Sequence, residues 1–542
     1  MNNAIYRLQR PENEPARNYR PGSEEARSLI EEVERQRATP VEIPLIIGGK
    51  EIRTGDTADV VMPHDHKHKL GFFHKAGEKE VRIAIEAALD ARAAWAALPW
   101  EDRAAVAMKA AELISIRYRD VINASTILCQ SKNIWQAEID AACEAADFLR
   151  FNAYGASRIF EDLEPVQSQR TFNIIEFRPL EGFVYAVTPF NFTAIACNLN
   201  MAPATLGNVT VWKPATASVL SSWRLMSIYR EAGLPDGVIN FVPGSGSLIS
   251  GAVLGHKYFA GLHFTGSNAT FNALWRQIAD NLPKYRSYPR IVGETGGKDF
   301  IFAHRSANTD ELSTAIVLGA FEYQGQKCSA SSRSYIPKSL WPEVRGKILD
   351  LVSKIGMGDP ADPQNLMGAV IDENSFDFIV KHIEEAKKSP DVELLTGGGH
   401  DKSKGYFIEP TVLVCRDPKY VTMETELFGP VMSVYVYDDE KYDETLALCD
   451  DTSPYGLTGS IFSRDRYAAV RAREALKYSA GNFYINDKTS GATVGQQPFG
   501  GSRASGTNDK VGSAFNLAKW LTPRSIKDNY MPPRDVVFPH MR

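Results

Sequence analysis

The chain has 542 residues, of which 44% are hydrophobic and 23% charged, and its formal net charge is −5. A chain of this length exceeds a single hydrophobic core, so its ordinary globular composition predicts two or three domains. The slight negative charge argues against general binding to nucleic acid or to anionic membranes, because both attract basic surfaces.

The six cysteines are widely spaced and never form a CxxC pair. This spacing disfavours a structural zinc site and a disulfide framework, and it fits a reducing compartment. The first residues lack the apolar core of a signal peptide, and Glu12, Glu14, Glu24 and Glu25 argue against a mitochondrial presequence. No apolar run reaches the length of about 18 residues that spans a membrane. We therefore expect a soluble, intracellular protein.

The first half of the chain predicts an arm followed by helices. Residues 1–40 are polar and predict an arm with one helix over 23–37, and residues 43–56 predict two short strands around Gly48-Gly49. From residue 78 to about 154 the apolar spacing is mostly helical and predicts four helices, with breaks at Pro99 and near residues 131–132. The segment HDHKH at 64–68 resembles a metal pattern, but no acidic or cysteine cluster completes it, so we interpret it as a solvated loop.

Short apolar strands then alternate with helical patterns. Residues 170–182 alternate as an exposed edge strand, and four strands follow at 182–189, 208–215, 238–244 and 261–267. Strand and helix in series indicate a doubly wound parallel sheet. A second series from 298 to 487 predicts a second α/β domain, and residues 518–530 predict a strand that pairs with the early exposed edge.

Several strand ends carry residues suited to a ligand. Gly266 and Ser267 follow a strand in FTGS, and Lys213 follows another in VWKPA. Strand ends of a doubly wound sheet are where ligands bind, and a serine that opens a helix can hold a phosphate. The dinucleotide spacing GxGxxG is absent. Taken alone, the glycines are therefore better explained by tight turns and Lys213 by a solvated strand end.

Glu294 and Cys328 are candidates for catalysis. Glu294 lies between glycines in GETGGKDF, where a carboxylate can approach a ligand as a general base. Cys328 lies in AFEYQGQKCSASSR, which predicts an exposed, hydroxyl-rich turn before a strand. A free cysteine is usually a buried apolar residue, but this polar neighbourhood favours a reactive thiolate.

Six motifs in order resemble the aldehyde dehydrogenase superfamily over nearly all of the chain beyond residue 45. They are TPFNF (188–192), WKPA (212–215), FTGS (264–267), GETGGK (293–298), QGQKCS (324–329) and ETELFGP (424–430). The segment from Asn482 to Lys510 is similar to the branch of this superfamily that oxidises L-glutamate γ-semialdehyde to L-glutamate, the second step of proline catabolism.

The resemblance implies a thiohemiacetal and thioester mechanism with NAD as the cofactor. Cys328 is then the nucleophile, Asn191 and the Cys328 backbone N–H form the oxyanion hole, and Glu294 is the base that activates water. It also implies cofactor contacts from Thr188, Pro189, Phe190, Lys213, Gly266, Ser267, Glu426 and Phe428. Thr216 carries no charge that would repel a 2′-phosphate, so use of NADP stays open.

The same resemblance implies how the substrate is recognised. The backbone N–H groups of Gly491 and Ala492 would bind the α-carboxylate with help from Ser329. Phe192 and Phe499 would enclose the aliphatic middle of the substrate. No metal is implied.

The implied fold has two doubly wound α/β domains, one for the cofactor and one for catalysis, and a small β oligomerisation flap. The expected divisions are an arm and the first part of the NAD-binding domain (1–166), the oligomerisation hairpin (167–183), the rest of the NAD-binding domain (184–293), the catalytic domain (294–504) and the C-terminal oligomerisation strand and tail (505–542). We expect a homodimer, with higher order open, in the bacterial cytoplasm or, in a eukaryote, the mitochondrial matrix.

Four alternatives compete with this interpretation. Another aldehyde dehydrogenase, acting on succinic or methylmalonic semialdehyde, is disfavoured by the 489–499 loop. An enzyme that transfers the acyl group to CoA is disfavoured by Glu294, which favours hydrolysis. A catalytically silent structural relative is disfavoured because Cys328, Asn191 and Glu294 are all present, and a cysteine hydrolase because no histidine lies near these motifs.

Overall fold

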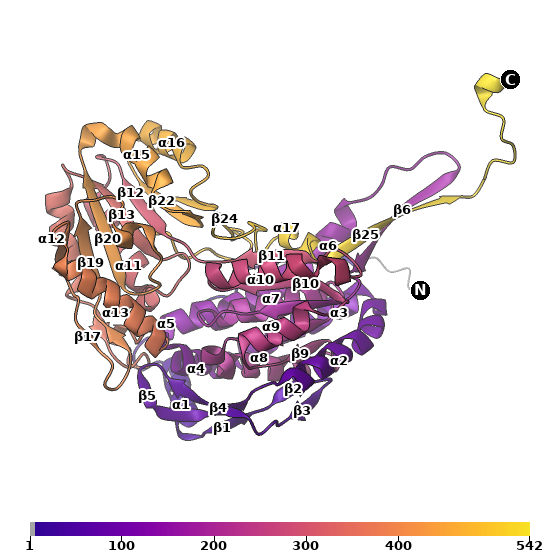
Figure 1. The fold of residues 1–542 in the computed structure, drawn as a ribbon, viewed down its shortest axis with the longest axis horizontal. Helices are drawn as coiled ribbons and strands as arrows, with labels where there is room; N and C mark the ends of the chain where they lie inside the picture. The colour runs from indigo at the N-terminus through magenta and orange to yellow at the C-terminus, as the bar shows by residue number, and fades with distance from the viewer. Residues whose placement is uncertain (1–5) are drawn as a thin grey trace.

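The computed structural model describes residues 6–542 and contains two large sheets (Figure 1). The first has seven strands in the order β11-β10-β7-β8-β9-β2-β3. These strands are β11 (Arg290–Glu294), β10 (Phe259–Thr265), β7 (Phe183–Val187), β8 (Thr210–Lys213), β9 (Ile239–Phe241), β2 (Leu45–Ile47) and β3 (Lys50–Ile52). The strands from β11 to β9 are parallel, and the predicted pair β2–β3 extends the sheet as an antiparallel edge.

The strand order of the first sheet reverses beside β7. The chain passes from β7 to β8 and β9 on one side, and β10 and β11 add on the other side of β7. Such a reversal leaves a crevice at the carboxyl ends of the strands, where α/β proteins bind ligands. Val187, Lys213 and Thr265 end β7, β8 and β10, so this crevice is bordered by the TPFNF, WKPA and FTGS motifs.

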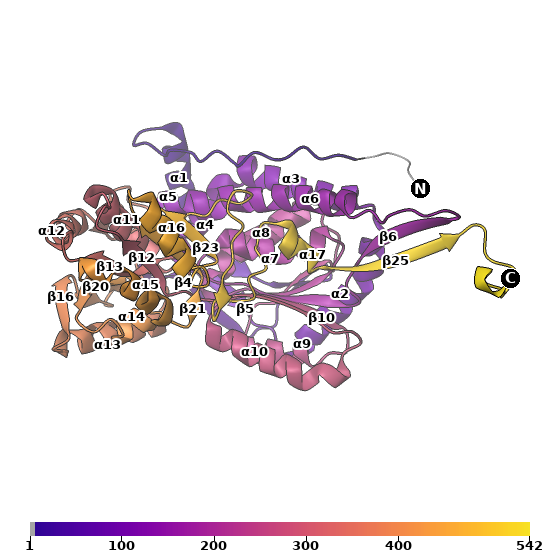
Figure 2. The same cartoon turned by 90° about the horizontal axis from the view of Figure 1, so that it is seen from above.

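Helices cover both faces of the first sheet, which completes the doubly wound arrangement. Figure 2 shows α7, with α3 and α6 outside it, on the face opposite to α9 and α10. The bounds are α1 (Glu24–Ala38), α2 (Glu78–Ala97), α3 (Trp100–Glu112), α4 (Arg119–Gln130), α5 (Ile134–Ala137), α6 (Glu144–Asp162), α7 (Thr193–Thr205), α8 (Val219–Ala232), α9 (Gly246–Leu254) and α10 (Asn268–Asn281). The predicted helix breaks are confirmed: Pro99 precedes α3, and Ser131 ends α4 in the left-handed conformation (φ 58°).

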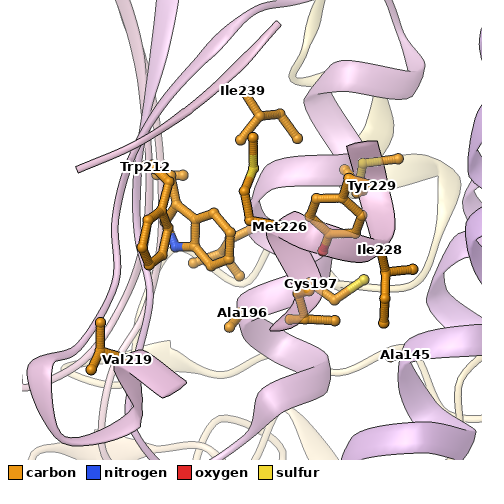
Figure 3. Packing of buried hydrophobic residues seen from close by; sticks show 14 of the residues in the cluster. Ala145, Ala196, Cys197, Trp212, Val219, Met226, Ile228, Tyr229 and Ile239 are labelled. Carbon is orange, nitrogen blue, oxygen red and sulfur yellow. The ribbon is translucent and has the colours of Figure 1, made fainter. Parts of the chain in front are cut away.

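A buried aromatic residue of β8 anchors the cofactor-side crevice. Trp212 packs against Phe241 with ring centroids 5.1 Å apart, and it lies among residues of α7 and α8 such as Cys197 and Tyr229 (Figure 3). Its indole Nε1 donates a hydrogen bond to Thr188 Oγ1 at 3.0 Å. Because Trp212 is fully buried, this bond fixes the turn after β7 to the core of the sheet.

The second sheet also has seven strands, in the order β16-β19-β20-β13-β12-β22-β23. They are β16 (Val392–Thr396), β19 (Thr411–Cys415), β20 (Val431–Tyr437), β13 (Ser331–Pro337), β12 (Asp299–Ala303), β22 (Thr458–Phe462) and β23 (Asn482–Ile485). All adjacent pairs are parallel except β16 with β19. The helices of this half are α11 (Thr309–Phe321), α12 (Trp341–Val352), α13 (Glu373–Lys388), α14 (Val421–Glu424), α15 (Tyr442–Asp451) and α16 (Arg466–Ala475). The last helix, α17 (Ala514–Ala518), packs against α6 and the first sheet instead.

The alternation of side chains along β12 divides the core of the second sheet in two. Phe300 and Phe302 pack with α13 and α15, whereas Ile301 and Ala303 pack with α11 and α12. Successive strand residues point to opposite faces, so a strand that is apolar throughout must be covered on both. The prediction of two α/β sheets with helices on both faces is confirmed.

An antiparallel two-stranded arm projects from the body of the molecule. β6 (Thr171–Pro179) pairs with β25 (Leu521–Asn529) over nine residue pairs, from Leu521↔Pro179 to Asn529↔Thr171. Figures 1 and 2 both show this pair reaching away from the two large sheets. The predicted pairing of the exposed edge strand with the C-terminal tail is confirmed.

The interpretation of HDHKH as a solvated loop is wrong. Residues Asp65–His74 form strand β5 of a small sheet with β1 (Val41–Ile43) and β4 (Thr57–Met62). His64 is buried, and its Nδ1 lies 3.2 Å from Ser131 Oγ, while His68 Nε2 lies 2.8 Å from the carbonyl of Arg37. Burial lowers the pKa of His64 to about 4. Packing against a distant segment, which the local polarity does not reveal, explains the difference.

Within the described part of the chain, no helix is both long and apolar enough to cross a membrane. No group of three or more metal-ligating side chains comes together in residues 6–542.

Candidate active site

Lys213 brings an unpaired ammonium to the cofactor-side crevice. It is the last residue of β8, and burial lowers its pKa. Lys213 is half-buried, and among the described residues its ammonium has neither a hydrogen-bond nor an ion-pair partner. The ε-carbon of Lys213 lies 4.0 Å from where a Cβ on Gly246 would be, at the start of α9. A polar ligand in the crevice, such as a ribose with its hydroxyls, would satisfy this ammonium.

Gly266 and Ser267 connect the crevice to helix α10. Ser267 is the N-cap, and its Oγ accepts a hydrogen bond from Thr270 N at 3.3 Å. Gly266 N donates to the carbonyl of Glu294 at 3.2 Å, so the same turn touches the end of β11. The N-terminus of a 14-residue helix attracts anionic groups, which suits the pyrophosphate of a dinucleotide. With the unpaired Lys213, these features fit a bound NAD.

The second sheet contributes Glu426 and Phe428 to the same region. Glu426 Oε1 accepts a hydrogen bond from Gly297 N at 2.9 Å, and burial raises the pKa of Glu426 to about 7. Phe428 adopts a left-handed backbone (φ 56°), and its ring meets that of Phe190 edge-on, with centroids 5.8 Å apart. Predicted cofactor residues from TPFNF and ETELFGP are therefore in contact across the two halves of the chain.

The Cys328 turn is packed against other segments of the chain, and the prediction that the turn is exposed is wrong. Cys328 itself is partly accessible, but Gln326 and Ser329 are buried. Tyr323 and Gln324 adopt left-handed backbone conformations, and Gln324 Nε2 donates to the carbonyls of Ser131 and Ala369 at 2.9 Å each. Hydrogen bonds to segments about 193 and 45 residues away along the chain hold the turn rigidly.

Asn191 lies beside the turn, as the oxyanion-hole prediction requires. Its Nδ2 donates to the carbonyl of Gln326 at 3.0 Å, two residues before Cys328. An amide nitrogen carries two hydrogens, so the second remains for an oxyanion near the sulfur. The buried position of Asn191, 4% exposed, keeps water from competing for that hydrogen.

Burial dominates the electrostatics of Cys328 and Glu294. Burial raises the pKa of the Cys328 thiol, and the carboxylates of Asp299, Glu294 and Glu426 raise it further. The pKa of Glu294 is also raised well above its ordinary value by burial, while the N–H of Gly501 and the charge of Lys510 oppose the rise. Gly501 N donates to Glu294 Oε2 at 3.4 Å, and Oε1 has no partner in the described chain. Glu294 is thus a carboxylate of increased basicity with one oxygen free.

Residues 489–499, which we call the substrate loop, contact the Cys328 turn directly. Thr489 Oγ1 donates to the carbonyl of Ser329 at 2.7 Å and also lies 2.7 Å from Ser331 Oγ. The backbone N–H groups of Gly491 and Ala492 have no acceptor among the described residues. Gly491 has φ +100°, a conformation that favours glycine. Two consecutive free N–H groups next to a nucleophile suit a substrate carboxylate.

Phe499 closes the far end of the loop through a backbone bridge to Val511, with hydrogen bonds of 3.1 and 2.7 Å. Phe192 starts α7 on the other side, directly after Asn191. The ring of Phe192 lies 3.9 Å from the Lys132 ammonium and 6.0 Å from that of Lys327. Of the two rings predicted to enclose the substrate, that of Phe192 therefore lies next to charged ammonium groups.

Two features of the site were not predicted from the sequence. Ser490 is buried next to Gly491, and its hydroxyl has no partner in the described chain. Lys132 is fully buried, donates to Asp140 Oδ2 at 2.6 Å, and burial lowers its pKa to about 8. Lys327, whose ammonium lies 6.0 Å from the Phe192 ring, pairs with Asp140 and Glu322, and Glu322 also pairs with Lys488. Ser490 is visible in the TSGATVG segment of the sequence, but the sequence does not reveal that its side chain is buried.

The arrangement of a partly accessible cysteine, an amide donor, a basic carboxylate and a dinucleotide crevice defines a class of dehydrogenase. Residues 52–526 match the model of the aldehyde dehydrogenase family. The chain belongs to this family, and the predicted family is confirmed.

Named relatives narrow the comparison. A mitochondrial Delta-1-pyrroline-5-carboxylate dehydrogenase of Dictyostelium discoideum is 51% identical over 98% of this chain and 96% of its own length. A probable delta-1-pyrroline-5-carboxylate dehydrogenase of Schizosaccharomyces pombe is 48% identical over 99% of both chains. The crystal structure of the Mycobacterium tuberculosis Delta-pyrroline-5-carboxylate dehydrogenase bound with NAD aligns with a TM-score of 0.96 and 46% identity over 100% of both chains.

Proposed function

We propose that this chain is an NAD-dependent dehydrogenase that oxidises L-glutamate γ-semialdehyde, the open form of Δ1-pyrroline-5-carboxylate, to L-glutamate. The observation that carries the proposal is the substrate loop, in which free N–H groups at Gly491 and Ala492 lie next to a hydrogen bond that ties Thr489 to the Cys328 turn. Relatives named for this reaction match nearly the full chain.

In the proposed mechanism Cys328 Sγ adds to the aldehyde carbon. The thiol must lose a proton first, because its raised pKa keeps it protonated at neutral pH. Glu294 is the nearby group with raised basicity and a free oxygen that can accept this proton. Asn191 Nδ2 and the backbone N–H of Cys328 donate to the oxyanion of the thiohemiacetal, a contribution of about 3 kcal/mol in comparable sites.

NAD, when bound, supplies the acceptor for the hydride that the thiohemiacetal carbon loses. Lys213 and Glu426 would hold the two riboses, Gly266 and Ser267 the pyrophosphate, and Phe428 the nicotinamide end, next to Thr188, Pro189 and Phe190. The thioester that remains on Cys328 is cleaved by water, from which Glu294 removes a proton. Thr216 offers no charge against a 2′-phosphate, so NADP is the second cofactor to test.

In the proposed site, groups on both sides of Cys328 would select the substrate. The α-carboxylate would bind the N–H groups of Gly491 and Ala492, with Ser329 beside them, and Phe192 and Phe499 would enclose the methylene groups. Succinic semialdehyde is also an aldehyde with a carboxylate, but it is one carbon shorter and lacks the ammonium group.

We also propose the domain division that the two sheets support, with NAD-binding residues in 1–166 and 184–293, the catalytic domain in 294–504 and an oligomerisation flap in 167–183 and 505–542. The proposed assembly is a homodimer. The proposed compartment is the bacterial cytoplasm or, in a eukaryote, the mitochondrial matrix; the Dictyostelium relative is named as mitochondrial.

The test is to follow NADH formation with L-glutamate γ-semialdehyde and with succinic semialdehyde, in the wild type and in Cys328→Ala. We expect the wild type to prefer the first substrate by at least about tenfold in kcat/KM, and the variant to be inactive with both. Equal rates with the two substrates would contradict the proposed specificity, and activity without the thiol would contradict the mechanism.

A further inference from the structure

The N-terminal arm lies across the helices that border the substrate loop. Its backbone and side chains are tied to a buried ion pair: Arg17 N and Tyr19 Oη donate to Glu138 at 2.7 and 2.8 Å. Glu14 forms ion pairs with Arg119 and Arg150 at 2.6 Å each. The N-terminal arm is therefore fixed to α4 and α6, and it can hold other segments that contact it in place.

Asn13 precedes Glu14 in this arm, and both the nitrogen and the oxygen of its side-chain amide form hydrogen bonds. Its Nδ2 donates to Asp147 Oδ2 and to the carbonyl of Val494, both at 2.8 Å, and its Oδ1 accepts from Gln496 Nε2 at 2.9 Å. The reversed amide would place its oxygen against a carboxylate and a carbonyl, so the network fixes the orientation. Asn13 thus links α6 to the substrate loop.

The middle of the substrate loop has few other restraints. Every hydrogen bond between residues 490–497 and the rest of the described chain goes to Asn13 or Arg10. The Arg10 bond to the carbonyl of Gly495 is exposed and 3.4 Å long, so the contribution of Asn13 is the larger. Packing adds to it, because Val494 is buried and Gly495 lies against the ring of Phe151.

We propose that Asn13 is a positioning residue for substrate recognition: by holding Val494 and Gln496 it sets where the free N–H groups of Gly491 and Ala492 stand relative to Cys328. The inference rests on the proposed function, since the loop matters only if it binds the carboxylate of an amino-acid aldehyde. Asn13 itself contacts the loop and not the substrate. Its loss therefore acts on substrates that carry the carboxylate and spares those that lack it.

The test compares L-glutamate γ-semialdehyde with propionaldehyde, which has no carboxylate, in Asn13→Ala. We expect kcat/KM for glutamate semialdehyde to fall about tenfold, mainly through KM, and that for propionaldehyde to change less than about twofold. Arg17→Ala is the matched control, because its side chain forms only a 3.6 Å pair with Asp120 and leaves the loop untouched.

A second readout does not depend on catalysis. Amide hydrogen exchange of residues 490–497 in the enzyme without substrate should speed up in Asn13→Ala and stay unchanged in Arg17→Ala. Gln496→Ala removes the contact from the loop side; it should reproduce part of the KM effect, and its combination with Asn13→Ala should be less than additive. If Asn13→Ala does not fold, the KM of Gln496→Ala decides the question.

Equal losses for both aldehydes, or unchanged exchange in the loop, would overturn the positioning role. A wild type that shows no preference for glutamate semialdehyde over succinic semialdehyde would instead overturn the proposed function, and the positioning role with it. The two failures are distinguished because the second is measured on the unmodified enzyme.

Discussion

The reactive groups of this site are kept neutral by burial. The pKa of Cys328 is raised by burial and by three carboxylates, and Glu294 shares the same desolvated pocket. A thiolate is therefore not stored in this site, contrary to the favourable setting that the polar neighbours of Cys328 suggested. The chemistry instead depends on the ionised form of Glu294, whose raised pKa makes it a stronger base than an ordinary carboxylate and whose Oε1 has no partner in the described chain.

Lys510 opposes the rise that burial causes in the pKa of Glu294. Its Nζ donates to the carbonyls of Gly481 and Gly500 at 2.8 and 2.9 Å, which supports Gly501, and its positive charge lowers the pKa of Glu294. Lys510→Met removes the charge and the support, so the pKa of Glu294 rises. Glu294 must be ionised to act as a base, so we expect the acid limb of the kcat/KM profile to move to higher pH.

The measurement is a pH–rate profile with glutamate semialdehyde for the wild type, Lys510→Met, Lys510→Arg and the exposed control Lys477→Met. Lys510→Arg retains the charge and should keep the wild-type midpoint. A shift to lower pH in Lys510→Met, or an equal shift in Lys510→Arg, would argue against the electrostatic role.

The identity of the reactive residues was readable from the sequence, but their environment was not. Cys328 and Glu294 stand in short motifs that are visible along the chain. The rigidity of the Cys328 turn comes from the Gln324 amide, which binds carbonyls of Ser131 and Ala369 in other parts of the fold. The assigned roles of the individual site residues stay predictions until variants are measured.

Among the elements, the projecting strand pair β6–β25 exposes an apolar surface. Phe172 and Ile174, two residues apart on one face of β6, are 59% and 47% exposed. Alternate strand residues share a face, so these side chains form an apolar strip on a projecting arm. We expect the strip to be covered by a second copy, and Phe172→Glu with Ile174→Glu to convert a dimer into a monomer.

Sedimentation velocity measures this directly. Tyr467→Glu is the control, because Tyr467 is an 86% exposed aromatic residue on α16, away from the arm. A wild type that sediments as a monomer, or a doubly substituted arm that leaves the dimer intact, would show that the arm does not form the interface.

Most elements of the fold were predicted where local patterns are strong. The strands that end in Pro, Gly, Thr or Ser turns, the helix breaks and the pairing of the tail with residues 171–179 all follow from such patterns. Strands β16, β19 and β22 were not singled out, and β5 was missed because its HDHKH start is locally polar and the distant segments that cover it are not visible in the local sequence. Long-range pairing, which local polarity does not encode, decides such segments.

At the scale of the whole molecule, the catalytic site joins two separately wound sheets. Asn191, Phe190 and Lys213 come from the first sheet, and Glu426 and Cys328 from the second half of the chain. Contacts such as Phe190 with Phe428, and Asn191 with the carbonyl of Gln326, align the two halves. The cofactor crevice and the Cys328 thiol therefore lie where the two halves meet, and neither half alone would form the complete active site.

In the proposed mechanism Cys328 carries a glutamyl thioester that Glu294 helps to hydrolyse. The most direct test is the intact mass of Glu294→Gln after incubation with L-glutamate γ-semialdehyde and NAD, followed by peptide mapping. Because Gln cannot accept a proton, Glu294→Gln slows both the activation of the thiol and the hydrolysis of the thioester. Addition by the small thiolate fraction is slow, but each thioester then persists, so after a long incubation we predict that one glutamyl group accumulates on Cys328 and that Cys328→Ala with Glu294→Gln carries none. An unmodified Cys328 during continued turnover, or a glutamyl group on another residue, would contradict the proposed thioester mechanism.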